Sequence, residues 1–468
     1  MLRRITPSPI DDNENKENSM ELITHKKITS IEKKHFFHKG LEYASPARGH
    51  WNIVHIGMLV PGCHQIYIGG LGCIYGVVLT AAEMNAMDRY SSVIVTENDI
   101  LDARRMEPLI YNGIIEILER LPSLPPAVLV FPTCMHRFMG TDMNVIYKRL
   151  RKKYPSIDFV DCYMDPIMDD RGLNSEQYCR RQVYAFLHPS TTVDKKQIGI
   201  IGNDLSIPED SDIRYIINQF GFDMKDITQY KDYTDYQTFA RSSLMLYTNP
   251  NVYGAKALFE HKHNIPVKYL PETFDMDQIE IELRQIYNYL AVLSDTHNTE
   301  DIEDWLSSSH KSSEDSLKHA YSIVGDVPIA IDYQAVFRPF ELAKLLTMYG
   351  FKVSRIYADF TSDEDIDAFN WIKNNVPDLD VYSAEKADMR YAPRSTATHM
   401  IAIGQLAAYL TGTKHYVNLI ANDTRWGFSG IRRLSQELEA AFIKEGNPEQ
   451  EIIQKGLGGV SCIGGGCI

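Results

Sequence analysis

The chain has 468 residues, enough for two to four domains at roughly 100–200 residues each, and 44% of them are apolar while 24% are charged. These proportions exclude a largely disordered chain. Its 62 acidic side chains outnumber its 48 lysines and arginines, which gives a formal net charge of −14. Because binding to nucleic acid or to an anionic membrane requires a basic face, this excess of acid argues against both as partners.

The two ends of the chain differ in composition from the rest. Residues 1–35 are mostly polar and carry no secretory signal, and we predict that they form a flexible arm. Residues 446–468 end in a glycine-rich run with Cys462 and Cys467, for which we predict a flexible tail. The longest apolar-rich stretch, residues 55–82, contains six glycines and is a poor membrane span. We therefore expect a cytoplasmic protein with reduced thiols.

Between the two ends, one pattern recurs three times: a β-branched strand, a Gly- or Pro-bearing turn, an amphipathic helix and another strand. The first unit, residues 36–190, has predicted strands at 93–95, 127–131 and 157–161 and helices at 106–121, 141–153 and 175–187. The second, residues 191–315, has strands at 197–202, 243–247 and 265–269 and helices at 210–220 and 253–262. The third, residues 316–445, has strands at 328–331, 352–357 and 380–383 and helices at 338–349 and 362–374. This alternation predicts an α/β protein of three doubly wound, Rossmann-like domains with parallel sheets.

Two polar segments separate the units. Residues 189–196 join the first unit to the second, and residues 295–316, which are acidic and rich in serine, are predicted to link the second to the third. Since open parallel sheets hold their ligands at the carboxyl ends of the strands and between domains, we look for functional residues there.

The seven cysteines are too few and too scattered for a disulfide framework, but four of them fall in the first unit near predicted turns. Cys63 and Cys73 each follow a glycine, and Cys134 and Cys162 each follow a predicted strand. Strand ends of a parallel sheet share one edge, so these sulfurs are candidates to converge there. Iron–sulfur clusters need several thiolates that converge from shielded loops.

Other interpretations of these residues stay open. Any of these cysteines can pack as a small apolar side chain, and Cys179, inside a predicted helix, is assigned to packing. The absence of a C-x-x-C pair excludes zinc-finger and ferredoxin spacing. His64 and His136 each follow a candidate thiol, where an imidazole can hydrogen-bond to sulfur or simply be buried in its neutral form. No phosphate-binding G-x-x-x-x-G-K-[ST] loop occurs, so we do not expect the chain itself to hydrolyse ATP.

Several short motifs occur in one order along the chain. Ile68–Cys73 looks like a strand-to-Gly-Cys turn, Thr96–Ile100 is similar to an acidic E-x-D-I segment, and Thr133–Asp142 looks like a second cysteine turn. Trp426–Gly430 resembles a G-F-x-G turn before a last helix. With these motifs, residues 36–445 resemble the nitrogenase component 1 family, which includes catalytic subunits of nitrogenase, dark-operative protochlorophyllide reductase, chlorophyllide reductase and nickel-sirohydrochlorin reductive cyclase.

The resemblance implies an iron–sulfur cluster, 4Fe–4S or larger, that bridges two subunits with up to three cysteines from each. Cys73 and Cys134 match the family's ligand positions. Cys63 is the candidate third ligand, although it lies only ten residues before Cys73, whereas the family's first cysteine lies further upstream. Cys162 is a candidate for a fourth position. The implied partners are a second copy or a paralogous subunit, up to a heterotetramer, and a separate ATP-hydrolysing iron–sulfur reductase.

The sequence also departs from the nitrogenase pattern. Thr248 stands about where nitrogenase supplies a cofactor-binding cysteine, and Trp426 stands where it supplies a histidine. We therefore predict a nitrogenase-like reductase subunit that acts on a substrate other than dinitrogen. A scaffold that carries or assembles a cofactor is the second hypothesis, and a non-redox small-molecule-binding protein is the third.

Overall fold

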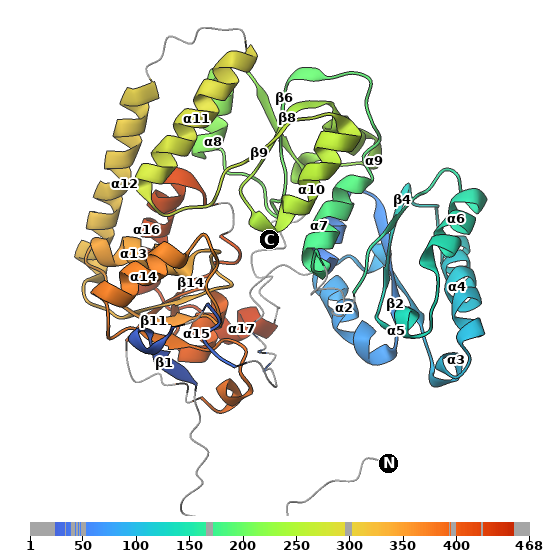
Figure 1. Ribbon diagram of the computed structural model, residues 1–468, viewed down its shortest axis with the longest axis horizontal. Coiled ribbons are helices and arrows are strands. Elements are labelled where there is room, and N and C mark those ends of the chain that lie inside the picture. The colour runs from blue at the N-terminus through green and yellow to red at the C-terminus, as the bar shows by residue number, and fades with distance from the viewer. Residues whose placement is uncertain are drawn as a thin grey trace, which may run out of the picture.

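The computed structural model describes residues 24–453 apart from 33, 39–42, 44, 46, 48–52, 165–171, 295–301, 393, 395–398 and 423–424. Three α/β domains follow one another along the chain, each built around its own sheet (Figure 1). Most of the predicted arm and tail, with Cys462 and Cys467, lies outside the described residues.

The first domain contains a four-stranded parallel sheet in the order β3 (Tyr90–Ile94), β2 (Cys63–Gly69), β4 (Ala127–Pro132) and β5 (Asp158–Asp161). Alternate residues of β4 point to opposite faces, as the two-residue period of a strand requires. One face packs on α4 (Met106–Arg120) and α6 (Met143–Lys153). The other packs on three further helices: α1 (Ile53–Met58), α2 (Leu71–Glu83) and α7 (Ser175–Ala185).

The second domain repeats this plan with a parallel sheet in the order β7-β6-β8-β9. Its strands are β6 (Asp194–Ile200), β7 (Asp223–Asp226), β8 (Ser242–Tyr247) and β9 (Val267–Tyr269). Its helices are α8 (Asp212–Gln219), α9 (Tyr233–Tyr236), α10 (Tyr253–Leu258) and α11 (Met276–Ser294). Helix α7 of the first domain packs on α10, so one apolar core runs through both domains.

The third domain has a six-stranded sheet in the order β1-β12-β11-β10-β13-β14. Its strands are β1 (His25–Lys27), β10 (Ile329–Asp332), β11 (Val353–Tyr357), β12 (Asp380–Tyr382), β13 (Ile401–Ile403) and β14 (His415–Val417). Its helices are α12 (Ile302–Val324), α13 (Pro339–Met348), α14 (Ile366–Asn375), α15 (Gln405–Thr411), α16 (Gly427–Ile443) and α17 (Pro448–Ile453). The predicted fold class, α/β with parallel sheets, is confirmed.

One end of the predicted flexible arm is part of this sheet. β1 pairs antiparallel with β12 at the edge of the sheet, and His25 lies opposite Tyr382. Ile28 and Ile31, just beyond the strand, are buried in the core of the third domain. The polar composition of residues 1–35 hid this short segment, whose few apolar side chains anchor it. The prediction of a flexible arm is therefore wrong for the described residues that include β1, Ile28 and Ile31.

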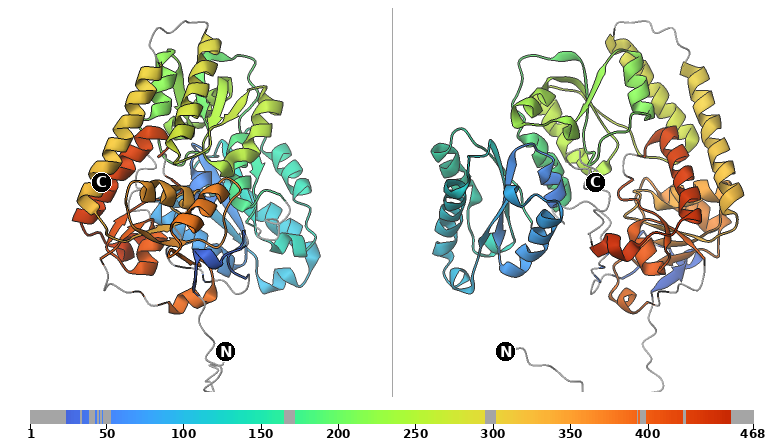
Figure 2. Two further views of the ribbon diagram at one scale, coloured as in Figure 1. Left: turned by 60° about the vertical axis from the view of Figure 1, so that its left-hand side comes forward. Right: turned by 180° about the vertical axis from the view of Figure 1, so that it is seen from behind.

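The segment predicted as a linker between the second and third units is mostly helix α12. Residues 302–316 form the first part of this helix. Helix α12 packs along α16, and these two helices run side by side in both views of Figure 2. Leu306, Leu317 and Val324 lie on its buried face. The acidic side chains and most of the serines occupy the other positions, while Ser309 and Ser313 lie on the buried face, and this composition masks the helical spacing. Among the described residues, no helix has both the length and the apolar character needed to cross a bilayer.

Candidate functional site

Two cysteine-bearing turns lie at the carboxyl edge of the first sheet. β2 ends at Gly69, Gly70 caps helix α2, and Cys73 lies exposed in the first turn of that helix. On the neighbouring strand β4, Cys134 follows the last residue by two positions and caps the short helix α5 (Met135–Phe138).

Backbone contacts join these two turns. The N–H of Thr133 donates to the carbonyl oxygen of Ile68 at 2.8 Å. A Cβ on Gly69 would lie 2.4 Å from Cγ2 of Thr133, so a glycine is required where the turns cross. A Cβ on Gly70 would lie 3.6 Å from the sulfur of Met135, the residue after Cys134. The fold therefore brings the segments that carry Cys73 and Cys134 together, as the sequence predicts.

Large apolar side chains are exposed along the same edge. Leu71 and Tyr75 of α2 are 69% and 64% exposed, and Phe138 of α5 is 74% exposed. Leu101, which follows the short helix α3 (Glu97–Ile100) at the end of β3, is 85% exposed. We call these four residues, with Cys73 and Cys134, the cysteine edge. Clustered exposed apolar side chains are typical of a surface that meets another protein.

Cys63 does not lie at the cysteine edge. It is the first residue of β2, opposite Ala127 at the start of β4, and therefore lies at the amino end of the sheet. Its side chain is fully buried, and burial raises the pKa of the thiol to about 12. Cys63 follows a glycine, as Cys73 does, but it begins β2 instead of following a strand, and the sequence did not show where β2 begins.

Cys162 follows the last residue of β5, as predicted, but it faces the core that α7 covers. Its thiol is buried, shares a hydrogen bond with the thiol of Cys179 on α7, and has a pKa well above the usual range because of burial. The packing role predicted for Cys179 agrees with its complete burial. Among the described residues, no three His, Cys, Asp or Glu side chains are grouped to hold a metal ion. A cluster at the cysteine edge would need ligands beyond those that the described residues group there.

The two histidines next to candidate thiols hydrogen-bond elsewhere. Nε2 of His64 lies 2.9 Å from Oγ of Ser91, and burial lowers the pKa of this histidine to about 4, so it is neutral at pH 7. His136 is buried in α5, and its Nδ1 lies 2.5 Å from the carbonyl oxygen of Thr133. That contact holds the turn that carries Cys134, which makes His136 a positioning residue for this turn.

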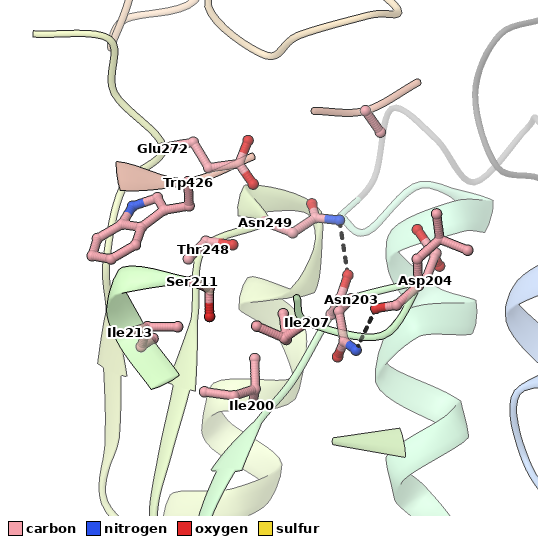
Figure 3. Close-up of a pocket in the computed structure, with 13 residues that line it drawn as sticks. Ile200, Asn203, Asp204, Ile207, Ser211, Ile213, Thr248, Asn249, Glu272 and Trp426 are labelled. Atoms are coloured by element: carbon pink, nitrogen blue, oxygen red, sulfur yellow. Dashed lines mark hydrogen bonds between the residues drawn. The ribbon is translucent and has the colours of Figure 1, made fainter. Parts of the chain in front are cut away.

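A second feature, the interdomain pocket, lies between the second and third domains at the carboxyl edge of the second sheet (Figure 3). Its cavity has a volume of about 40 Å³. Ile200 and Ile213 supply apolar lining, while Asn203 and Asn249 lie in the loops after β6 and β8. Trp426, just before α16, lines it from the third domain, and its indole Nε1 donates to the carbonyl oxygen of Pro271 at 3.1 Å.

Thr248 and Trp426 both line the interdomain pocket. The resemblance had placed nitrogenase's cofactor ligands at these two positions, which are far apart in the sequence, and the structure brings them to one site. Neither side chain is a thiolate or an imidazole, so an iron–molybdenum-type cofactor does not fit the donor set at these positions. The hydroxyl of Thr248 instead hydrogen-bonds to the carboxyl group of Glu272.

Glu272 is a pocket residue that no sequence pattern indicates. It follows β9, is only 6% exposed, and burial raises the pKa of its carboxyl group to about 7. Nδ2 of Asn422, from the third domain, donates to its Oε2 at 3.0 Å. No motif surrounds Glu272, and an isolated glutamate is usually exposed, so its burial follows only from the way the domains meet.

The fold and these two features define a three-domain α/β protein with cysteine-bearing turns at one sheet edge and a pocket between the other two sheets. Residues 54–443 match the family model described as "Nitrogenase component 1 type Oxidoreductase". This match covers most of the chain, and the chain belongs to that oxidoreductase family. No curated protein matches it.

Solved structures share the fold, and two of them are nitrogenase structures. One, titled "Nitrogenase Cp1 at pH 6.5", aligns over 88% of this chain and 95% of its own, with a TM-score of 0.62 and 13% sequence identity. The other, "Nitrogenase Cp1 at pH 5", aligns over 87% of this chain and 90% of its own, with a TM-score of 0.54 and 13% identity. At this identity the likeness establishes the architecture of the chain over nearly its whole length.

Proposed function

We propose that this protein is an iron–sulfur oxidoreductase subunit that accepts electrons from a separate ATP-hydrolysing reductase and passes them to a substrate other than dinitrogen. The observation that carries the proposal is the placement of Cys73 and Cys134 on adjoining turns of one sheet edge. Membership of an oxidoreductase family supports the redox assignment. Reduced thiols are required, and we propose the cytoplasm as the compartment.

The cysteine edge fits a cluster that is shared between two chains. Two cysteines supply half of the four thiolates that a 4Fe–4S cluster requires, and a second subunit would supply the rest. The exposed Leu71, Tyr75 and Phe138 beside them offer the apolar surface that such a contact would bury. The second subunit is either another copy of this chain or a paralogue.

This chain's own residues would position and shield the redox centre. The bound cluster would supply one-electron transfer, with a potential set by hydrogen bonds, burial and charge. The first turn of α2 presents Cys73 at a helix N-terminus, and His136 fixes the turn of Cys134. Thr248 and Trp426 in the interdomain pocket favour a substrate other than dinitrogen, because they lack the donors that the nitrogenase cofactor requires.

The test is a set of four single variants, purified anaerobically together with any partner subunit. We expect Cys73→Ala and Cys134→Ala to lose most of their bound iron and acid-labile sulfide. Cys63→Ala and Cys162→Ala serve as matched controls from the same domain, because their thiols are buried away from the cysteine edge. These controls are expected to keep their iron and to unfold at a lower temperature.

Two outcomes would count against the assignment. Unchanged iron in folded Cys73→Ala and Cys134→Ala proteins would remove the cysteine edge as the cluster site. Loss of iron in folded Cys63→Ala or Cys162→Ala protein would instead establish those positions as ligands, as the resemblance suggested.

A cofactor-assembly scaffold is the second candidate, and the pocket lining favours it as much as it favours a reductase. Thr248 and Trp426 would let a cofactor pass without being anchored. Electron uptake separates the two candidates: a reductase subunit oxidises its reduced partner protein repeatedly when substrate is present, whereas a scaffold does not.

A further inference from the structure

The interdomain pocket offers hydrogen-bond acceptors without any basic side chain. Among the described residues, its lining contains no lysine, arginine or histidine but includes the carboxyl groups of Asp204 and Glu272. A site without a fixed positive charge is poorly suited to a phosphate or carboxylate ligand. Its polar groups therefore favour a ligand that donates hydrogen bonds.

Asn203 supplies one unused acceptor. This side chain lines the pocket opposite Trp426 in Figure 3, is 8% exposed, and donates through Nδ2 to the carbonyl oxygen of Leu205 at 2.9 Å. That contact fixes the orientation of the amide, since the opposite orientation would set two oxygens against each other. The remaining atom, Oδ1, is buried and has no hydrogen-bond partner among the described residues. A buried acceptor without a partner is costly, so it points to a ligand donor.

Glu272 supplies the charge. Its carboxyl group accepts hydrogen bonds from Nδ2 of Asn422 and from the hydroxyl of Thr248, both of which stabilise the ionised form. Burial acts in the other direction and raises its pKa to about 7, although the charge of Arg338 also favours the ionised form. A positively charged ligand in the pocket would stabilise the ionised carboxylate further.

Asp204, by contrast, is already paired. Its two carboxylate oxygens accept hydrogen bonds from the guanidinium of Arg180 at 2.9 and 2.7 Å. Arg180 is buried on α7, so the ion pair ties the first domain to the second beside the pocket. Glu272 is therefore the pocket carboxylate left to meet a ligand.

We propose that the interdomain pocket binds a small organic cation through N–H groups that donate to Glu272 and to Oδ1 of Asn203. The apolar side chains of Ile200, Ile213 and Trp426 would pack on the ligand's carbon atoms. This inference rests on the proposed function and deepens it, because it names the class of ligand that the redox subunit would hold in the interdomain pocket. Binding itself needs no electrons.

The test compares two probes of the same shape and opposite charge, acetamidinium and acetate, on the purified full-length protein. Binding is followed by saturation-transfer NMR and by titration calorimetry at pH 7.5. Neutral acetamide is the third probe, with a charge between those of the other two. Acetamidinium is expected to bind more tightly than acetamide, and acetate is expected not to bind. Glu272→Gln should weaken acetamidinium binding by about tenfold or more, the effect expected when a charge-assisted hydrogen bond is lost.

The matched control is Glu282→Gln. Glu282 lies on α11, is buried, and has a carboxyl pKa that burial likewise raises to about 7, but it does not line the pocket. The Glu282→Gln variant should bind acetamidinium as tightly as the unaltered protein does. Asn203→Ala is a second variant, which should also weaken binding and which decides the question if Glu272→Gln does not fold.

Acetate binding as tight as acetamidinium binding would overturn the inference, as would acetamidinium binding that neither Glu272→Gln nor Asn203→Ala alters. Selective acetamidinium binding by a protein that carries no iron would support this inference while removing the proposed redox function. A protein that binds iron and takes up electrons but shows no preference for acetamidinium would support the proposed redox function and overturn this inference.

Discussion

At the scale of single residues, Asp212 shows how a buried carboxylate joins two domains. It lies at the start of α8 in the second domain, and its Oδ2 accepts a hydrogen bond from the backbone N–H of Ser429, in the first turn of α16, at 2.9 Å. Gly427 allows this approach, because its φ is +78° and a Cβ there would lie 2.4 Å from the same oxygen. The contact gives a physical reason for the glycine of the Trp426–Gly430 motif.

Asp212 also predicts a pH dependence of stability. Burial raises its pKa to about 6, although the N–H of Ser429 and the guanidinium of Arg432 act in the opposite direction. An aspartate in the unfolded chain has a pKa of about 3.9. Between these values the folded protein binds more protons than the unfolded chain, so the Asp212 contribution to the free energy of unfolding falls as the pH rises from about 4 to about 6.

The Asp212→Asn variant should lose this contribution, since an asparagine can still accept the hydrogen bond from Ser429 but does not ionise. Relative to the unaltered protein, its free energy of unfolding should rise by up to roughly 3 kcal/mol between pH 4 and pH 7. Urea unfolding at both pH values measures the change. Asp223→Asn, at an exposed position of the same domain, is the control and should show no such trend. An equal trend in both variants would contradict the argument.

The residues of the two sites were predictable to different degrees. Cys73 and Cys134 could be placed from sequence, because each follows an apolar strand and strand ends share an edge. Cys63 could not, since it is the first residue of β2 and does not follow a strand. Asn203 could be placed only at the end of a predicted strand, and Glu272 gave no signal, because their importance comes from burial between domains that only the folded chain brings together.

At the scale of elements, α12 is the clearest example of a helix hidden by its composition. Ser313 is fully buried on its inner face, and its Oγ lies within hydrogen-bond distance of the carbonyl oxygens of Ser309 and Phe428, at 3.0 and 3.1 Å. Serines that satisfy backbone carbonyls can line a buried face, so a serine-rich sequence does not require a loop. Phe428 belongs to α16, and these contacts fasten the two helices together.

Leu317 on α12 provides the test of this packing. It is fully buried, and Leu317→Ala should lower the free energy of unfolding by about 2–5 kcal/mol through lost burial and the cavity left behind. Leu293→Ala on α11 makes the same substitution at an exposed position and should cost less than about 1 kcal/mol. Chemical denaturation measures both. Equal and small losses would contradict the packing of α12 into the core.

The regular strands and helices were more predictable than these exceptions. β4 and β8 alternate apolar residues between two covered faces, and α4 places Ile110, Ile114 and Leu118 on one stripe. These periodicities are set locally and can be counted in the sequence. All three residues of β1 are polar, and none is fully buried. The strand forms by pairing with β12, and this long-range pairing leaves no local pattern in the sequence.

At the scale of the whole molecule, the three domains separate two candidate sites. The cysteine edge belongs to the first domain alone, whereas the interdomain pocket is built where the second and third domains meet. Helix α7 and the Arg180–Asp204 ion pair connect the first domain to the second. The succession of three α/β units was predictable from alternating strands and helices, but the way their edges meet depends on long-range contacts that a sequence pattern does not contain.

The central claim is that the cysteine edge holds an iron–sulfur cluster, and electron paramagnetic resonance of the anaerobically purified, dithionite-reduced protein, with iron and sulfide counted per chain, tests it most directly. The account predicts bound iron and sulfide, a charge-transfer absorbance, and a cluster signal that disappears when Cys73 and Cys134 are both replaced by alanine. Iron and sulfide near zero in a folded protein isolated with its partner subunit would contradict it.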